Sequence, residues 1–372
     1  MSRREEQEKA RPETVEIVPG VLRMELPISM PGLGHVNCYA LVDSEGATVV
    51  DPGLPGSANW KALLDRLKQA GLSAKHIHTV VVTHSHPDHF GGAARFASES
   101  GAEVVAHRNF AFASYGARPA EPEVSVEDLD ADRVRRQEAA SESGQAPEEP
   151  ARPAATPNPS DRWKGNSPWG GQHPKPPLRS RMRWRLMRMA GPGSFIPTIT
   201  RPVEHGDVLE IGGREWFVLH TPGHTEDHIC LHDPDSGVFL AGDHVLPTIT
   251  PHISGLGHAR DPLKSFFYSL DRVGEIHGVK KVLPAHGHPF QDLHSRTEAI
   301  KRHHFERLEK VKEIGRELGG ATVEAYTQRL FKRRSWGPMA ESETYAHLEH
   351  LRLSGEAESH RDKDEKLIYL TG

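Results

Sequence analysis

The sequence predicts an α/β fold, in which strands and helices alternate and pack in layers. Short apolar runs that are typical of buried strands recur along both halves of the chain, as at 80–82 and 238–241. Segments whose apolar residues have helical spacing lie between such runs, as at 58–70. Potential metal-binding side chains directly follow several of the runs, which is where α/β folds place their chemistry.

The N-terminal half is predicted to alternate between the two kinds of element. Trp60, Leu64 and Leu67 have the spacing of one helical face, and Gly71 provides the stop. The expected elements are short strands within 14–51, a helix over 58–70, a strand at 80–82, a helix over about 91–99 and a strand at 103–106.

Residues 113–199 break this pattern and are predicted to form a partly flexible insertion or lid. The stretch 120–177 is rich in charge and proline, so it cannot bury enough apolar surface to order itself. Residues 178–190 are predicted to form a basic helix, which we expect to pack on the domain by an apolar stripe that includes Met182. A lid over the active site and an RNA-contacting element are the alternatives for this helix. Three of the six tryptophans lie in the insertion, which favours docking of part of it over complete disorder.

Strand signals return after residue 200. Gly212 and Gly213 predict a hairpin turn between two of the strands. The expected elements are strands at 208–211, 215–220, 229–232 and 238–241, a helix over about 262–276, a strand at 280–283 and a long helix over about 293–317. One domain is therefore predicted to comprise 14–112 and 200–318.

The last segment, 319–372, is predicted to contain two helices and a hairpin. The helix over 341–353 places Tyr345, Leu348 and Leu351 on one face, and Gly355 precedes the hairpin. This arrangement resembles a winged-helix module. Such modules can bind nucleic acid, but as often they only pack and dimerise, so a homodimer is one expectation.

Composition excludes several classes of protein. The net charge of −5 provides no general attraction for nucleic acid or an anionic membrane, although a local basic patch remains compatible with it. No run of 18 apolar residues is present, so no membrane span is expected. Cys38 and Cys230 lie in apolar runs and are expected to be buried thiols. The polar N-terminus lacks the apolar core of a secretory signal, which favours a cytoplasmic location.

Residues 84–89 (HSHPDH) are the most informative local motif, because four potential metal ligands occur within six residues after a strand. Imidazole and carboxylate together suit Zn²⁺ or a similar ion. His84 and His86 point the same way if the chain is extended, because side chains alternate. Asp88 and His89 come from the following turn and can face a second ion. The alternative of a histidine-rich surface loop accounts less well for this spacing directly after a strand.

Three later sites repeat the pattern of a strand followed by a ligand type. Small residues flank each ligand, so the backbone can turn tightly there. The ligands in question are His224 after 215–220, Asp243 after 238–241 and His286 after 280–283.

These ordered motifs, together with Asp51, resemble the metallo-β-lactamase superfamily over roughly 14–110 and 200–290. The resemblance implies an αββα sandwich with two metal ions at one edge of the sheets. It assigns one ion to His84, His86 and His224 and the other to Asp88, His89 and His286, with Asp243 bridging both and Asp51 orienting the ligands.

The expected chemistry is hydrolysis by a metal-bridging hydroxide, because two dications lower the pKa of a shared water. Asp88 is expected to orient this nucleophile and could accept its proton. Two Zn²⁺ ions are the expected cofactors, and iron or manganese are alternatives because mixed His/Asp ligands accept all three. His228, His244 and His288 are expected to be neighbours of the site.

The substrate is less constrained than the chemistry. Asp243 and the missing signal argue against antibiotic hydrolysis, and the residues after Asp243 differ from the loop of glyoxalase II. The motifs at 221–228 (TPGHTEDH) and 284–289 (PAHGHP), with the tail, resemble the β-lactamase-like-protein-2 group, which includes endoribonucleases. We therefore predict a hydrolase of a small ester, thioester or related metabolite. The alternatives are an endoribonuclease acting on single-stranded RNA and a non-catalytic metal-binding protein.

Overall fold

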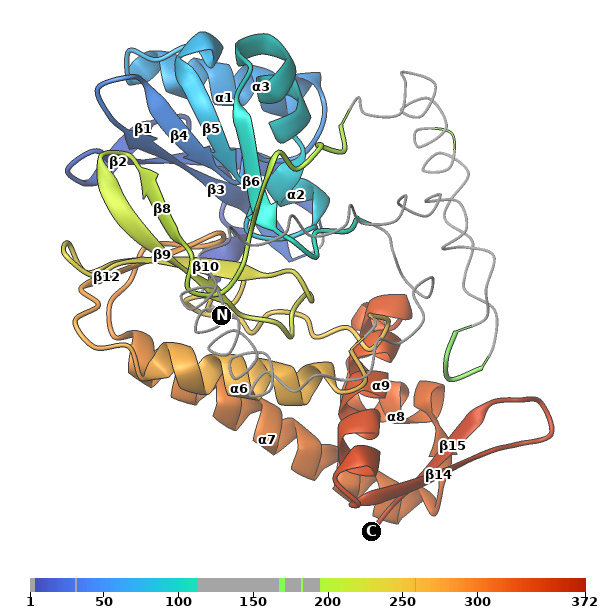
Figure 1. Cartoon of the computed structure of the whole chain (residues 1–372). Coiled ribbons are helices and arrows are strands. Elements are labelled where there is room, and N and C mark those ends of the chain that lie inside the picture. The colour runs from blue at the N-terminus through green and yellow to red at the C-terminus, as the bar shows by residue number, and fades with distance from the viewer. Residues whose placement is uncertain (1–3, 31, 113–166, 171–181, 183–194, 258) are drawn as a thin grey trace, which may run out of the picture.

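Two β-sheets face each other, and helices cover the outer face of each (Figure 1). The computed structural model describes residues 4–30, 32–112, 167–170, 182, 195–257 and 259–372. This layering is the predicted αββα sandwich, and the apolar side chains between the sheets include Tyr39, Val50 and Trp216.

The first sheet contains seven strands in chain order. Neighbours pair antiparallel from β1 to β4 and parallel from β4 to β7. The strands are β1 (Thr14–Val18), β2 (Val21–Met30), β3 (Leu33–Val42), β4 (Ala47–Val50), β5 (Ile77–Val81), β6 (Glu103–His107) and β7 (Arg201–Val203). A short 3-10 helix, η1 (Glu5–Gln7), precedes them, and another, η2 (Ala74–His76), leads into β5.

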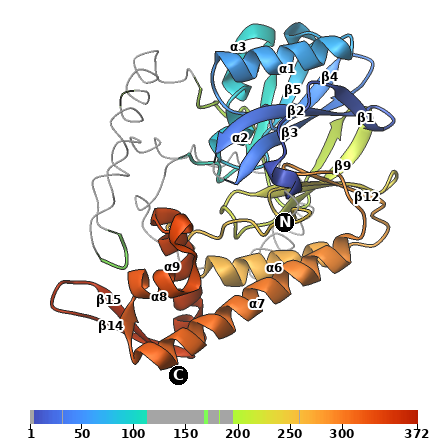
Figure 2. The same ribbon diagram turned by 180° about the vertical axis from the view of Figure 1, so that it is seen from behind.

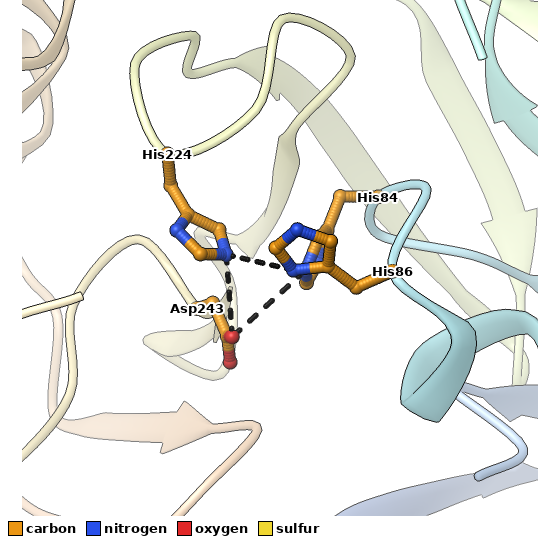
Figure 3. A group of neighbouring side chains, drawn as sticks. All are labelled: His84, His86, His224 and Asp243. Carbon is orange, nitrogen blue, oxygen red and sulfur yellow. Dashed lines mark hydrogen bonds and ion pairs between the residues drawn. The ribbon is translucent and has the colours of Figure 1, made fainter. Parts of the chain in front are cut away.

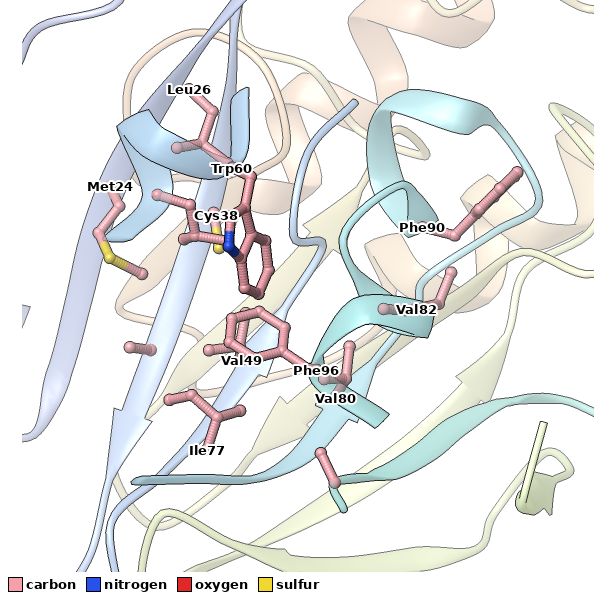
Figure 4. Close-up of a cluster of buried hydrophobic side chains, with 14 of the residues drawn as sticks. Met24, Leu26, Cys38, Val49, Trp60, Ile77, Val80, Val82, Phe90 and Phe96 are labelled. Carbon is pink, nitrogen blue, oxygen red and sulfur yellow. The ribbon is translucent and has the colours of Figure 1, made fainter. Parts of the chain in front are cut away.

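Helices α1 (Ser57–Gln69) and α3 (Ala93–Ser100) cover the outer face of this sheet, and α2 (Pro87–Phe90) is a single turn before α3. The apolar face predicted for 58–70 is buried, with Trp60 packed edge-on against Phe96 at a ring distance of 4.7 Å. Figure 4 shows this core, in which both rings belong to one buried cluster with Val49 and Val80 of the sheet. Aliphatic strand residues and aromatic helix residues therefore join the first two layers.

The second sheet contains five strands in the order β12-β11-β10-β9-β8. Its pairs are antiparallel except for β11 and β12, which are parallel. Gly212 and Gly213 have φ of 59° and 66°, as the predicted hairpin requires. The strands are β8 (Val208–Ile211), β9 (Arg214–His220), β10 (Ile229–Asp233), β11 (Val238–Gly242) and β12 (Lys281–Pro284), and α6 (Pro262–Gly274) and α7 (Leu293–Leu318) cover the outer face.

The C-terminal module follows α7 and contains the two helices and hairpin that the sequence predicts. It comprises β13 (Ala321–Thr322), α8 (Val323–Leu330), η4 (Arg333–Ser335), α9 (Pro338–Leu353), β14 (Ala357–Arg361) and β15 (Leu367–Thr371). Figure 2 shows α7 running from the sheet into this module. Phe266 of α6, Leu308 of α7 and Tyr369 of β15 belong to one buried cluster, so the module shares its core with the domain.

Most of the predicted insertion lies outside the described residues, including the basic helix apart from one residue. Met182 is 57% exposed, which differs from the expected packing. Residues 167–170 fall in the stretch expected to be flexible, yet Trp169 is buried against Tyr345. The carbonyl of Trp169 also accepts a hydrogen bond from the Leu367 N–H at 2.9 Å. The burial of Trp169 agrees with the expectation, from the tryptophan content, that part of the insertion docks on the rest of the chain.

Both cysteines are buried and free, as expected. None of the helices in the described parts of the chain is long and apolar enough to cross a membrane.

Candidate metal centre

The potential ligands lie just beyond the ends of five strands, and these ends meet at one edge of the two sheets. Asp51 follows β4, the motif at 84–89 follows β5, and His224 follows β9. Asp243 and His286 follow the parallel neighbours β11 and β12. The structure thus brings together residues more than 200 positions apart in the chain.

One group of donors contains His84, His86, His224 and Asp243 (Figure 3). His86 Nδ1 lies 3.0 Å from His84 Nε2 and 3.1 Å from His224 Nε2. Asp243 Oδ2 lies 3.8 Å from His84 Nε2 and 3.5 Å from His224 Nε2. The donor atoms all lie within 4.8 Å of one another, so one ion could contact all four.

A second group contains Asp88, His89 and His286. Asp88 Oδ2 lies 3.6 Å from Nε2 of both histidines. Asp243 also faces this group, with Oδ2 3.7 Å from His89 Nε2 and Oδ1 3.3 Å from His286 Nε2. The Asp243 carboxylate therefore lies between the two groups.

The outer nitrogen of four of the five histidines is held by a partner. His89 Nδ1 donates to Asp51 at 2.8 Å, and His84 Nδ1 lies 3.1 Å from the Thr83 hydroxyl. His224 Nδ1 donates to the carbonyl of His252 and His286 Nδ1 to that of His35, both at 2.7 Å. With the proton on Nδ1, each ring presents the Nε2 lone pair to the centre, as outer hydrogen bonds do in metal sites.

Several inward atoms are buried without a hydrogen-bond partner in the described residues. They are His89 Nε2, His286 Nε2 and Asp243 Oδ1. Leaving such atoms unsatisfied costs free energy, and a buried group of this kind calls for an ion or another partner. A set of imidazole and carboxylate donors is what Zn²⁺ and similar ions prefer, so the residues fit a metal.

The electrostatics of the centre also fit a cation. Burial lowers the pKa of both His84 and His86 well below the ordinary value, so both rings remain neutral donors. Burial alone would also lower the pKa of His89, but the nearby carboxylates, led by that of Asp88, raise it to about 10. Carboxylates that draw a proton in this way would also attract a metal cation.

Asp51, which the resemblance assigns to orienting the ligands, contacts the motif at 84–89 through its carboxylate. Its backbone φ is 54°, an uncommon value for a residue other than glycine. One carboxylate oxygen accepts the Thr83 N–H at 2.9 Å, and the other accepts the Thr83 hydroxyl and His89 Nδ1 at 2.8 Å each. Asp51 is therefore placed to orient His89 without reaching the centre.

Comparison with known proteins identifies the family. The model of the metallo-β-lactamase superfamily matches residues 31–313. The chain belongs to this superfamily.

Relatives within the superfamily differ in how much of the chain they match. The probable metallo-hydrolase YqjP of Bacillus subtilis is 26% identical over 347 residues, which is 88% of this chain and 90% of YqjP. The acyl-coenzyme A thioesterase MBLAC2 of Bos taurus is 34% identical over 97 residues, which is 25% of this chain and 33% of MBLAC2. The curated relatives that match only part of this chain are themselves matched over 26% to 40% of their own length.

A solved structure from the superfamily matches nearly the whole chain. The metallo-β-lactamase family protein TTHA1429 of Thermus thermophilus has a TM-score of 0.67 and 27% identity. The similarity covers 96% of this chain and 100% of that chain. Most of the C-terminal module therefore lies within the region of similarity.

The three histidines expected to be neighbours of this superfamily site have different surroundings. His228 Nε2 accepts the Asp243 N–H at 3.0 Å, so it supports the position of Asp243 directly. A Cβ on Gly242 would lie 2.6 Å from that nitrogen, which explains why glycine precedes Asp243. His244 is buried against Phe266, and His288 meets Arg11 at the surface.

Sequence reasoning missed the residues of β3 that support His286. His35, Asn37 and Tyr39 alternate along one face of an otherwise apolar strand, and all three are buried. The Asn37 amide and the Tyr39 hydroxyl each donate to the Pro284 carbonyl at 2.8 Å, and Asn37 also donates to the Gly287 carbonyl. Polar residues at every second position of a buried strand were the available signal for this role.

Proposed function

We propose that the protein is a dinuclear metal-dependent hydrolase of a small thioester or ester. The observation that carries this proposal is the pair of donor groups that share Asp243, with four histidine rings fixed by outward hydrogen bonds. A structural zinc site needs only four ligands and one ion, so seven donors favour a catalytic centre over the non-catalytic alternative.

We propose two Zn²⁺ ions, with iron or manganese as alternatives. One would be held by His84, His86 and His224, the other by Asp88, His89 and His286, and Asp243 would contact both. Bound dications supply Lewis acidity and lower the pKa of a water molecule so that it reacts near neutral pH.

Residues of the chain would orient the reaction. Asp88 is 4% exposed and belongs to the second donor group, so its carboxylate is the proposed group that orients the attacking water and accepts its proton. No protein nucleophile is needed. Burial raises the pKa of Cys38 well above its ordinary value and that of Cys230 to about 12, which disfavours either thiolate as the nucleophile.

The thioester class is supported by the relatives. The matched protein MBLAC2 is described as an acyl-coenzyme A thioesterase, and other local matches are hydroxyacylglutathione hydrolases. These matches lie in part of the chain only, so the substrate is our inference from them. A cytoplasmic location remains a prediction from the sequence.

A ribonuclease acting on single-stranded RNA is the second candidate. Lys332, Arg333 and Arg334 are exposed on the turn between α8 and α9, beside Trp336, which is 43% exposed. Cations next to an aromatic ring are what single-stranded nucleic acid uses for binding. This candidate would follow if the chain belongs to the β-lactamase-like-protein-2 group and if residues 319–372 are a winged-helix module. Because such modules also dimerise, we propose a homodimer as well.

Metal analysis followed by a substrate panel tests the proposal. We expect two divalent ions per chain and hydrolysis of an acyl thioester or ester that stops when a chelator removes the ions. The panel should include lactones, phosphodiesters and single-stranded RNA, with Asp88→Ala as a control for contaminating hydrolases. Cleavage of RNA without any thioester turnover would favour the second candidate, and failure to take up ions would reject both.

A further inference from the structure

The segment between β11 and α6 carries a contact on which the proposed metal centre depends. The carbonyl of His252 accepts the hydrogen bond that fixes the His224 ring, at 2.7 Å. Residues 251–254 form neither helix nor strand, so regular backbone hydrogen bonding does not fix this carbonyl. Its position must come from tertiary contacts.

Those contacts come from α9 in the C-terminal module. His252 Nδ1 donates to Glu343 Oε2 at 3.3 Å. The Gly255 N–H donates to the Ser342 carbonyl at 3.2 Å, and the Ser254 and Ser342 hydroxyls lie 2.8 Å apart. The segment and the helix are in close contact, because a Cβ on Gly255 would lie 2.5 Å from the Tyr345 ring.

Glu343 is held in one place from both sides. Its other oxygen pairs with Arg307 of α7, and the side chain is only 13% exposed. Burial alone would raise the pKa of Glu343, but the His252 hydrogen bond and Arg307 lower it to about 2. The carboxylate is thus charged and immobilised between α7 and the segment that carries His252.

We propose that Glu343 is a positioning residue for the metal centre, acting through His252 on the orientation of His224. This inference rests on the proposed function, because it assigns a task to the C-terminal module within the same centre. Helix α9 would then help to position His224, in addition to packing in the core that the module shares with the domain.

Metal titration of variants tests the inference without measuring activity. Glu343→Ala and His252→Ala are each loaded with Co²⁺, and the visible spectrum and a competing chelator report geometry and affinity. We expect each variant to bind one of the two ions at least about tenfold more weakly than the wild type, because the His252 carbonyl loses the side-chain contact that places it against His224, and disturbed outer hydrogen bonds commonly cost this much affinity. The affinity for the other ion should remain unchanged.

The double variant and a matched control separate positioning from a general loss of structure. If Glu343 acts through His252, the double variant binds no more weakly than either single variant. Glu349→Gln is the control, since it removes a carboxylate that pairs with Arg352 on the same helix and should leave both affinities unchanged. His252→Ala leaves Arg307 paired with Glu343, so it decides the question if Glu343→Ala does not fold.

Two results would overturn the inference. One is wild-type affinity for both ions in His252→Ala and Glu343→Ala. The other is additive losses in the double variant, which would mean that the two residues act independently. In either case two-ion binding by the wild type would leave the proposed function intact, whereas a wild type that binds no ion would overturn that function as well.

Discussion

Asp51 links the end of β4 to the motif that follows β5. Its carboxylate accepts three hydrogen bonds, two from Thr83 and one from His89. The residue itself lies outside both donor groups. A substitution there should therefore change ligand orientation before it changes the fold.

We expect Asp51→Asn to weaken metal binding by about 10- to 100-fold, because an amide cannot accept as strongly from His89 and can present N–H to it. Competition with a chelator measures the affinity. Asp43→Asn is the matched control, since Asp43 pairs with His78 at 3.1 Å outside the centre. Equal losses in both variants would indicate a general effect of carboxylate removal.

We expect Asp88→Ala to lower hydrolysis at least about 100-fold, because it removes the proposed proton acceptor and a donor of the second group. His86→Ala should have a similar effect by removing a donor of the first group. Turnover and thermal unfolding should be measured together, and with a chelator present the unfolding midpoint should stay close to that of Asp65→Ala, which alters the exposed face of α1. Retained turnover in Asp88→Ala would exclude the assigned role.

The seven candidate donors could be selected from the sequence because each follows a strand and is flanked by small or polar residues, and the structure brings them together in two groups. The sequence did not predict His252 or Glu343, since one lies in a stretch without regular structure and the other in a helix whose pattern concerns only its apolar face. Contacts between distant segments leave no periodic signal. His35 and Asn37 were detectable in principle, because they interrupt the apolar pattern of β3.

At the scale of elements, α7 and α9 meet through two buried histidines. His304 Nδ1 lies 3.1 Å from His347 Nε2, and His347 Nδ1 donates to the Glu343 carbonyl at 2.7 Å. Burial lowers the pKa of His304 to about 2 and that of His347 to about 4. Both rings are therefore neutral in the folded protein at physiological pH.

This pair predicts a loss of stability in mild acid. Unfolded histidines take up protons below about pH 6.5, whereas these two resist protonation while folded, so their contribution is complete above that pH and falls as pH drops towards 4. Between pH 6.5 and 5, each ring should lower the free energy of unfolding by up to about 2 kcal/mol. Urea unfolding at pH 7.5 and pH 5 measures this cost.

Between pH 7.5 and pH 5, we expect the free energy of unfolding of His347→Leu to fall by about 2 kcal/mol less than that of the wild type. His360→Leu, which alters an exposed ring of β14, should lose as much as the wild type. An unchanged pH dependence in His347→Leu would mean that other groups govern acid unfolding.

Most elements could be predicted to within a few residues from spacing and stop signals, α1 and the β8–β9 hairpin among them. The start of α9 was less accurate, because it begins at Pro338 and the apolar pattern starts only near Tyr345. The tryptophan content predicted that part of the insertion docks, but it could not show that Trp169 packs against Tyr345 of the module, because contacts between distant segments are not encoded in composition.

At the scale of the whole molecule, the donor groups bury His89 Nε2, His286 Nε2 and Asp243 Oδ1 without a hydrogen-bond partner in the described residues, so a bound cation would stabilise the folded chain. Ions that bind only the folded chain stabilise it by mass action, by about 4 kcal/mol when the free ion is a thousand times its dissociation constant. Chelation should therefore lower the thermal midpoint, and added Zn²⁺ should restore it.

Calorimetry with and without a chelator measures this shift. His86→Ala and Asp88→Ala serve as references, since each lacks a donor of one group and should show a smaller metal-dependent change. A wild-type midpoint that does not respond to the ion would contradict the metal assignment.

The scattering of the donors along the chain has a consequence for biosynthesis. The motif at 84–89 leaves the ribosome well before His224, Asp243 and His286, by roughly 10 to 40 s for the last of them at ordinary rates of translation. During that interval a nascent chain displays four chelating side chains without their partners. Loading with the correct ion is therefore best delayed until the second half has been made, and early capture of a competing transition metal is a hazard that the cell has to control.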